Sequence, residues 1–96
     1  MIEVALVGVV TTEPKMNVGK GGKSYCSVSV MFDNAKYMRV TAFNGVAEQM
    51  MAVKRMDRAY IEGRITQFEY NGRLDLQVVA SFIRTAKIGS NRDENV

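Results

Sequence analysis

The chain has 96 residues, the length of a single domain, and its 47% hydrophobic and 24% charged residues are typical of a folded protein. It contains no histidine and one cysteine, Cys26, which excludes a histidine general base, a Cys/His zinc site and an internal disulfide. The net charge of +3 favours an anionic partner, nucleic acid first.

No segment approaches the ~18 apolar residues that a membrane span needs, and no charged and apolar leader precedes the first predicted strand. We therefore expect a soluble, cytoplasmic protein without a membrane partner, a compartment that also suits a free thiol. Cys26 lies in an alternating apolar run, which predicts a small buried hydrophobic residue.

Three strands are predicted in the first half of the chain. Residues Ile2–Val10 are apolar on both faces, so the core or a partner chain should cover this strand on two sides. Gly8 at its middle suggests a bulge or a sharp bend. A basic, glycine-rich loop follows over Glu13–Lys23. Period-two alternation predicts two more strands and the turn between them, at Ser24–Phe32, Tyr37–Phe43 and Asp33–Lys36.

A short helix and a long hairpin are predicted in the second half. Asn44 is expected to cap an amphipathic helix over Gly45–Val53. Arg58–Tyr70 forms the fourth strand, and Asn71-Gly72 is a strong signal for a two-residue hairpin turn. The fifth strand, which the apolar stretch Phe82–Ile88 could extend, is expected to point four residues inward: Leu74, Leu76, Val78 and Ala80.

This order of elements predicts an all-β fold with small α content. Five strands with one helix between the third and the fourth suit a closed antiparallel barrel, which also removes exposed sheet edges. We expect one domain over residues 1–88 and a short polar tail over residues 89–96.

The sequence offers no set of catalytic residues. Gly22-Lys23-Ser24 matches the end of a phosphate-binding GxxxxGK[ST] loop, but Asn17 stands where the first glycine belongs. The segment that follows predicts a strand, whereas such a loop opens a helix. The acidic residues are scattered, and surface solvation accounts for Glu62 and Glu69. We therefore expect no enzymatic activity, no cofactor and no metal.

The third predicted strand carries a pattern that indicates a function. Period two places Tyr37, Arg39 and Phe43 on one face, opposite the apolar set. Two rings flanking a guanidinium suit single-stranded nucleic acid, because bases stack on rings while cations meet phosphates. The hairpin turn places a second ring and cation opposite each other. The predicted binding residues are Tyr37, Arg39, Phe43, Tyr70, Arg73, Lys20 and Lys23; alternatively, the rings pack in a subunit interface or beneath a loop.

Three segments carry motifs of a known family: VALVGVVTTEPKM, YMRVTAFNGVAEQM and AYIEGRITQFEYNGR. They resemble the bacterial single-stranded DNA-binding protein family, and the resemblance covers about Ile2–Ile88. It implies an OB-fold with Greek-key topology, usually as a homotetramer, that coats single-stranded DNA with little sequence preference. It also implies roles for single residues. Tyr37 falls where the family commonly has a base-stacking Trp or other aromatic, Phe43 on its stacking Phe, Arg39 on its neighbouring Arg, and Tyr70 on an aromatic of the hairpin.

The chain also departs from this family. Tyr replaces Trp at two positions, so the stacking area per base should be smaller. The turns at Asp33–Lys36 and Asn71-Gly72 are shorter than the family's DNA-wrapping loops, which argues against a long wrapping path. Met56 stands where the family tends to have Gly, which predicts a different exit from the helix. The family's acidic, Phe-ended tail is missing after Val96, so partner recruitment through such a tail is not expected.

Two hypotheses follow for the function. The first is a homo-oligomer, a dimer or tetramer, that binds and protects single-stranded DNA in replication, recombination or repair. RNA stays open as a ligand, because stacking does not distinguish the 2′-hydroxyl. The alternative is a primosome-like OB-fold module that mediates protein interaction and assembly and binds nucleic acid weakly.

Overall fold

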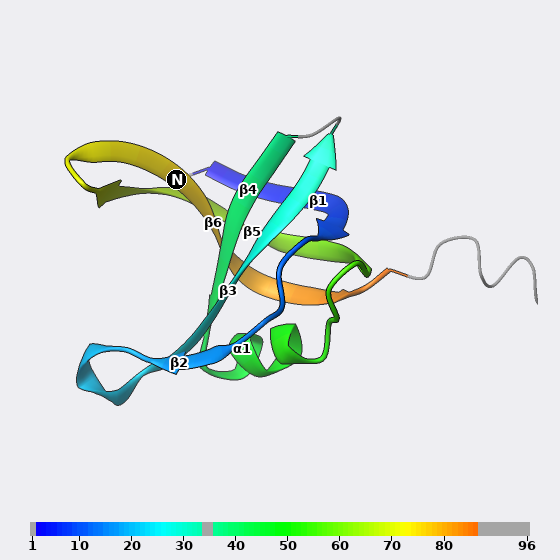
Figure 1. Cartoon of the computed structure of the whole chain (residues 1–96), viewed down its shortest axis with the longest axis horizontal. Coiled ribbons are helices and arrows are strands. Elements are labelled where there is room, and N and C mark those ends of the chain that lie inside the picture. The colour runs from blue at the N-terminus through cyan, green and yellow to red at the C-terminus, as the bar shows by residue number, and fades with distance from the viewer. Residues whose placement is uncertain (1, 34–35, 87–96) are drawn as a thin grey trace, which may run out of the picture.

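The computed structural model describes residues 2–33 and 36–86. The predicted tail over residues 89–96 and the centre of the predicted Asp33–Lys36 turn lie outside the described residues. The described elements, in chain order, are β1 (Ile2–Val10), β2 (Met16–Val18), the 3-10 turn η1 (Lys20–Gly22), β3 (Ser24–Asp33), β4 (Lys36–Phe43), α1 (Asn44–Met51), β5 (Arg58–Tyr70) and β6 (Arg73–Thr85) (Figure 1).

The sheet closes on itself. Its strand order is β1-β5-β6-β4-β3-β2, and β1 also pairs with β3, so five strands form a ring and β2 extends it beside β3. The pairs are antiparallel except β4–β6, which run parallel where Val40 lies opposite Val78. A closed five-stranded Greek-key barrel with a helix between β4 and β5 is the OB-fold. The predicted fold is confirmed, with the refinement that one pair of strands is parallel.

Alternate residues of the ring strands fill the barrel, as period two requires. The inner face of α1 covers one end of the barrel with Ala47 and Met50 (Figure 1). Cys26 is fully buried, as predicted, and burial raises the pKa of its thiol. The buried apolar set is Val10, Cys26, Val28, Val30, Val40, Ala42, Ala47, Met50, Val53, Ala59, Ile61, Val78, Ala80 and Ile83.

Two glycines allow strands to approach closely. A Cβ atom added at Gly8 would lie 2.6 Å from the carbonyl oxygen of Met31, just before β1 begins to pair with β3 at Val9. A Cβ atom added at Gly63 would overlap the carbonyl oxygen of Val79. Gly63 follows a register shift in the β5–β6 ladder. Any larger residue at either position must displace the neighbouring backbone.

One sequence prediction about β6 needs correction. Leu74 and Leu76 do not face the core, since they are 71% and 46% exposed. The β4–β6 pairing begins only at Gln77, so the residues before it belong to a hairpin arm that extends beyond the barrel (Figure 1). β6 continues through Phe82 and ends at Thr85, so the predicted extension is confirmed that far; residues 87 and 88 lie outside the described residues. In β3, Phe32 is exposed although alternation would place it on the same face as the buried Val28 and Val30, because the register shifts between Met31 and Asp33.

The predicted helix cap is wrong. α1 begins at Asn44 itself, no side chain caps it, and the helix ends at Met51. Asn44 instead adopts a left-handed backbone conformation with φ +53°, which asparagine tolerates better than most residues. Met56 has φ +77°, a conformation that glycine adopts readily. The backbone at the exit from α1 is therefore one that a glycine would also take, and the prediction of a different exit does not hold there.

The predicted basic loop is only partly a loop. β2 pairs with β3, with Met16 opposite Cys26, and all residues of β2 are exposed. β2 is only three residues long, whereas alternation identifies a strand only over four residues or more. None of the helices in the described part of the chain is long and apolar enough to cross a membrane.

Candidate nucleic-acid interface

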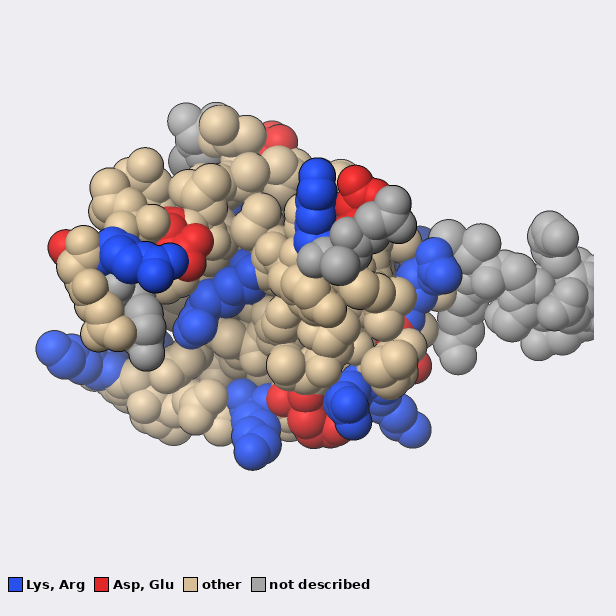
Figure 2. All heavy atoms as spheres, turned by 45° about the horizontal axis from the view of Figure 1, so that its top comes forward, with Lys and Arg blue, Asp and Glu red and all other residues tan. Residues whose placement is uncertain are grey.

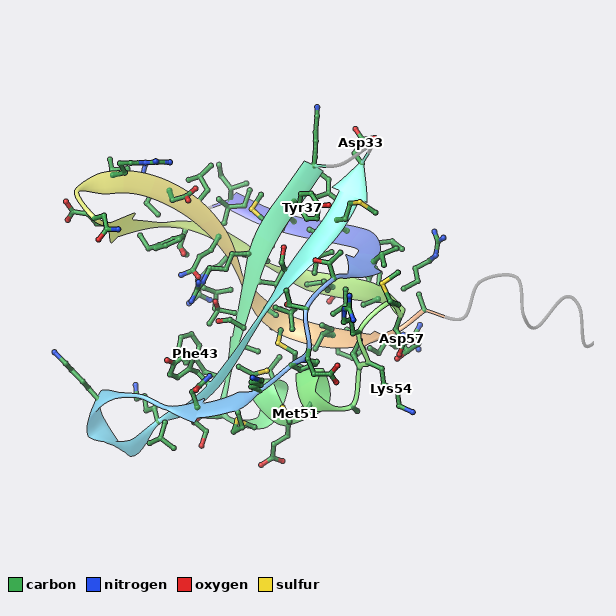
Figure 3. The ribbon with its side chains drawn as sticks, viewed as in Figure 1. Asp33, Tyr37, Phe43, Met51, Lys54 and Asp57 are labelled. Carbon is green, nitrogen blue, oxygen red and sulfur yellow. The ribbon has the colours of Figure 1, made fainter. Side chains whose placement is uncertain are left out.

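The outward side of β4 carries the predicted pattern. Tyr37, Arg39 and Phe43 are exposed, while Val40 and Ala42 point into the core. Figure 3 shows Tyr37 and Phe43 near opposite ends of the strand, and their six-residue separation corresponds to about 20 Å of strand. The two rings therefore mark the ends of a surface.

A groove of about 320 Å³ lies at the Phe43 end, and we call it the aromatic groove. Its wall contains three rings and three cations, and none of the described residues that line it is acidic. Phe43 and Tyr25 have ring centroids 6.3 Å apart and tilted by 42°. The Arg39 guanidinium carbon lies 5.5 Å from the centre of the Phe68 ring. The six residues are Tyr25, Phe43, Phe68, Lys20, Lys23 and Arg39.

A second groove of about 540 Å³, which we call the hairpin groove, lies at the Tyr37 end. Leu76 and Asp75 of the hairpin arm line it together with Tyr37. Figure 2 shows a hollow between the hairpin arm and the β3–β4 strands, with basic side chains around it. Arg39 lines both grooves, so the two adjoin at this residue of β4.

A chain of hydrogen bonds crosses the floor between the rings. Thr41 is 5% exposed, and its hydroxyl donates to Gln77 Oε1 over 2.9 Å. Ser27 Oγ lies 2.9 Å from Thr41 Oγ1, and Arg39 Nη2 donates to Ser27 Oγ over 3.5 Å. Because the one hydroxyl proton of Thr41 goes to Gln77, Ser27 must be the donor in its bond with Thr41. This chain ties residues of β3, β4 and β6 together.

The structure brings four of the seven predicted residues into one groove. Lys20, Lys23, Arg39 and Phe43 line the aromatic groove, and Tyr37 lines the hairpin groove. Arg73 is exposed at the start of β6, paired opposite Tyr70 as predicted, but is not among the described residues lining the two grooves. The side chain of Tyr70 lies outside the described residues.

Sequence reasoning missed three residues of the aromatic groove. Tyr25 lies opposite Phe43 in the β3–β4 ladder, and its outward position in a period-two strand was a usable signal. Phe68 and Gln77 reach the groove because the parallel β4–β6 pair brings the β5–β6 hairpin beside β4. No local sequence pattern predicts the contact of Phe68 and Gln77 with this groove. Within the described part of the chain, no group of three or more His, Cys, Asp or Glu side chains could hold a metal ion.

Comparison with known proteins agrees with this architecture. The Single-strand binding protein family matches residues 1–88. A curated single-stranded DNA-binding protein of Mycoplasma pneumoniae (strain ATCC 29342 / M129 / Subtype 1) is 30% identical over 82 residues. The match covers 78% of this chain and 49% of the relative, so the chain spans about half the length of the curated relative it matches. The family match includes the whole barrel, from β1 to β6, and we conclude that the chain belongs to the single-strand binding protein family.

Proposed function

We propose that this protein binds single-stranded DNA with little sequence preference and protects it during replication, recombination or repair. The observation that carries the proposal is the aromatic groove, where three rings and three cations lie on one open face without an acidic neighbour among the described lining residues. Family membership and the name of the Mycoplasma relative support the same function.

The two kinds of side chain divide the work. Rings of Tyr25, Phe43 and Phe68 offer flat apolar faces on which bases of any identity can stack. Lys20 and Lys23 stand at the rim in the η1 turn and the residue after it, where they meet phosphates. An unstacked single strand exposes both its bases and its phosphates to such a surface, whereas a duplex hides its base faces.

Fluorescence anisotropy with labelled dT, duplex DNA and oligo-U, at low and moderate salt, tests the proposal. We expect tight binding to dT and weak binding to the duplex. Three groove cations that each neutralise one phosphate predict a slope near −2 for log K against log salt, at about −0.7 per phosphate on single strands. Equal, weak binding to all three probes would contradict the proposal and favour the protein-interaction module.

A matched pair of variants locates the cations. The double variant Lys20→Gln with Lys23→Gln should make the salt slope shallower by about 1.4, because two phosphate contacts are lost. Lys54→Gln removes one charge beyond the end of α1, away from Tyr37 and Phe43 (Figure 3), and should leave the slope unchanged. If each removed lysine changed the salt slope by the same amount in both variants, DNA would be attracted by the overall charge of the protein and not by the groove lysines.

We also propose that the chain forms a homo-oligomer through β1. Ile2 is 63% exposed and Val7 is also exposed. β1 pairs with β5 along most of its length, whereas its described pairing with β3 is limited to Val9 and Val10. Its other edge is available to a second copy. Sedimentation equilibrium at micromolar concentration should give a multiple of the 10.7 kDa chain mass, and a monomeric mass would contradict this proposal.

A further inference from the structure

We infer that Gln77 reads the base edge in the aromatic groove and favours pyrimidines with a carbonyl at position 4, thymine and uracil, over cytosine. The inference rests on the proposed function, since it assumes that a base occupies this groove. Stacking alone gives binding with little sequence preference. The contact with Gln77 would add a modest preference for these two bases.

The first step is the orientation of the Gln77 amide. Its Oε1 accepts the proton of Thr41 at 2.9 Å, and Thr41 is buried and held in turn by Ser27. Because the amide oxygen of Gln77 accepts from Thr41, the amide nitrogen, with its two N–H donors, is left to face the groove. Within the described residues, no hydrogen bond uses Gln77 Nε2 as a donor.

The second step is the chemistry of the surroundings. Arg39 lies opposite Gln77 in the parallel ladder, donates to Ser27 over 3.5 Å and has further N–H groups to offer. Lys20 and Lys23 add only donors, and none of the described lining residues is a carboxylate. The groove therefore offers a base many donors and few acceptors.

The third step is the difference between the bases. Thymine and uracil present the O4 acceptor where cytosine presents an amino donor. The cytosine amino group would face the N–H donors of Gln77 and Arg39 instead of an acceptor. A polar group buried without a partner weakens binding, so we expect the 4-carbonyl to be preferred by about 3- to 10-fold, the effect of one hydrogen bond.

The test compares dU with dC oligonucleotides of equal length by anisotropy, because neither base carries the methyl group of thymine. Wild-type protein should bind dU about 3- to 10-fold more tightly than dC. Gln77→Glu keeps an acceptor for Thr41 but replaces the donors with a carboxylate, so the dU:dC affinity ratio should fall to one or below. Gln77→Met removes both functions at similar size and should give a ratio near one.

Gln67→Glu is the matched control. Gln67 is exposed on β5 and is not among the described residues lining either groove. The Gln67→Glu variant therefore adds the same charge to the same hairpin, but outside the grooves. It should lower affinity for both probes alike and keep the wild-type ratio. Equal dU:dC ratios in wild type, Gln77→Glu and Gln77→Met would overturn the inference while tight dT binding still supported the proposed function. Wild-type protein that binds neither dT nor dU would overturn the proposed function itself.

Discussion

Replacing Phe43 with alanine is expected to weaken binding to a dT oligonucleotide by about 5- to 150-fold, because base–aromatic stacking contributes about 1–3 kcal/mol per base. Phe43 ends β4, packs against Tyr25 at 6.3 Å and still exposes 41% of its surface. It lies outside the core, so the thermal midpoint should change little. Anisotropy titration of the variant against wild-type protein measures the effect.

Phe32→Ala is the control for this prediction. Phe32 has the same exposed fraction of 41% but is not among the described residues lining either groove. The Phe32→Ala variant therefore removes the same kind of ring from another part of the barrel. Equal losses of affinity in the two variants would mean that Phe43 has no special position, and an unchanged affinity in Phe43→Ala would remove it from the site.

Gly63→Ala is expected to destabilise the barrel by about 3 kcal/mol, the upper part of the usual range for overpacking. The new methyl group would overlap the carbonyl oxygen of Val79 and lie 3.0 Å from Cα of Ala80. Both are backbone atoms of β6, so no side-chain rotation can relieve the contact. For a domain of this size, such a loss corresponds to a thermal midpoint about 12–24 °C lower.

The same substitution at Gly45 should have the opposite sign. Gly45 lies in α1, and a Cβ atom added there meets nothing within 4 Å. Alanine in a helix is favoured over glycine by about 0.5–1 kcal/mol, so Gly45→Ala should raise the thermal midpoint slightly. Calorimetry of the two variants separates close approach of strands from the general cost of losing a glycine. Similar midpoints for both would contradict the role assigned to Gly63.

The features that were predictable from the chain are those set by near neighbours. Period-two alternation identified the two faces of β4, because successive side chains of a strand must point to opposite sides. Asn71 and Gly72 adopt φ values of +52° and +76°, the conformation that a two-residue hairpin turn requires. That turn then fixes Tyr70 opposite Arg73. The motifs quoted from the chain likewise sufficed to indicate the family that residues 1–88 match.

Contacts between segments that lie far apart in the sequence could not be predicted, because only the closed barrel determines them. Local alternation predicted Leu74 and Leu76 as core residues, but β6 meets β4 only from Gln77 onward, which leaves both exposed. The register shift between Glu62 and Gly63 changes which residues of β6 face inward beyond it, so Ile83 is buried. Neither effect has a signature in the residues concerned, because each depends on where a partner strand begins and ends.

The candidate site divides along the same line. Tyr37, Arg39 and Phe43 share a face through the geometry of one strand, and the chain sequence was enough to place them together. Phe68 and Gln77 join Arg39 and Phe43 only because closure of the sheet brings β6 beside β4 in parallel. The hydrogen bonds that orient Gln77 likewise need three strands in register. Periodicity acts over two residues, whereas the groove is assembled by pairings across the whole barrel, and only the folded chain decides those.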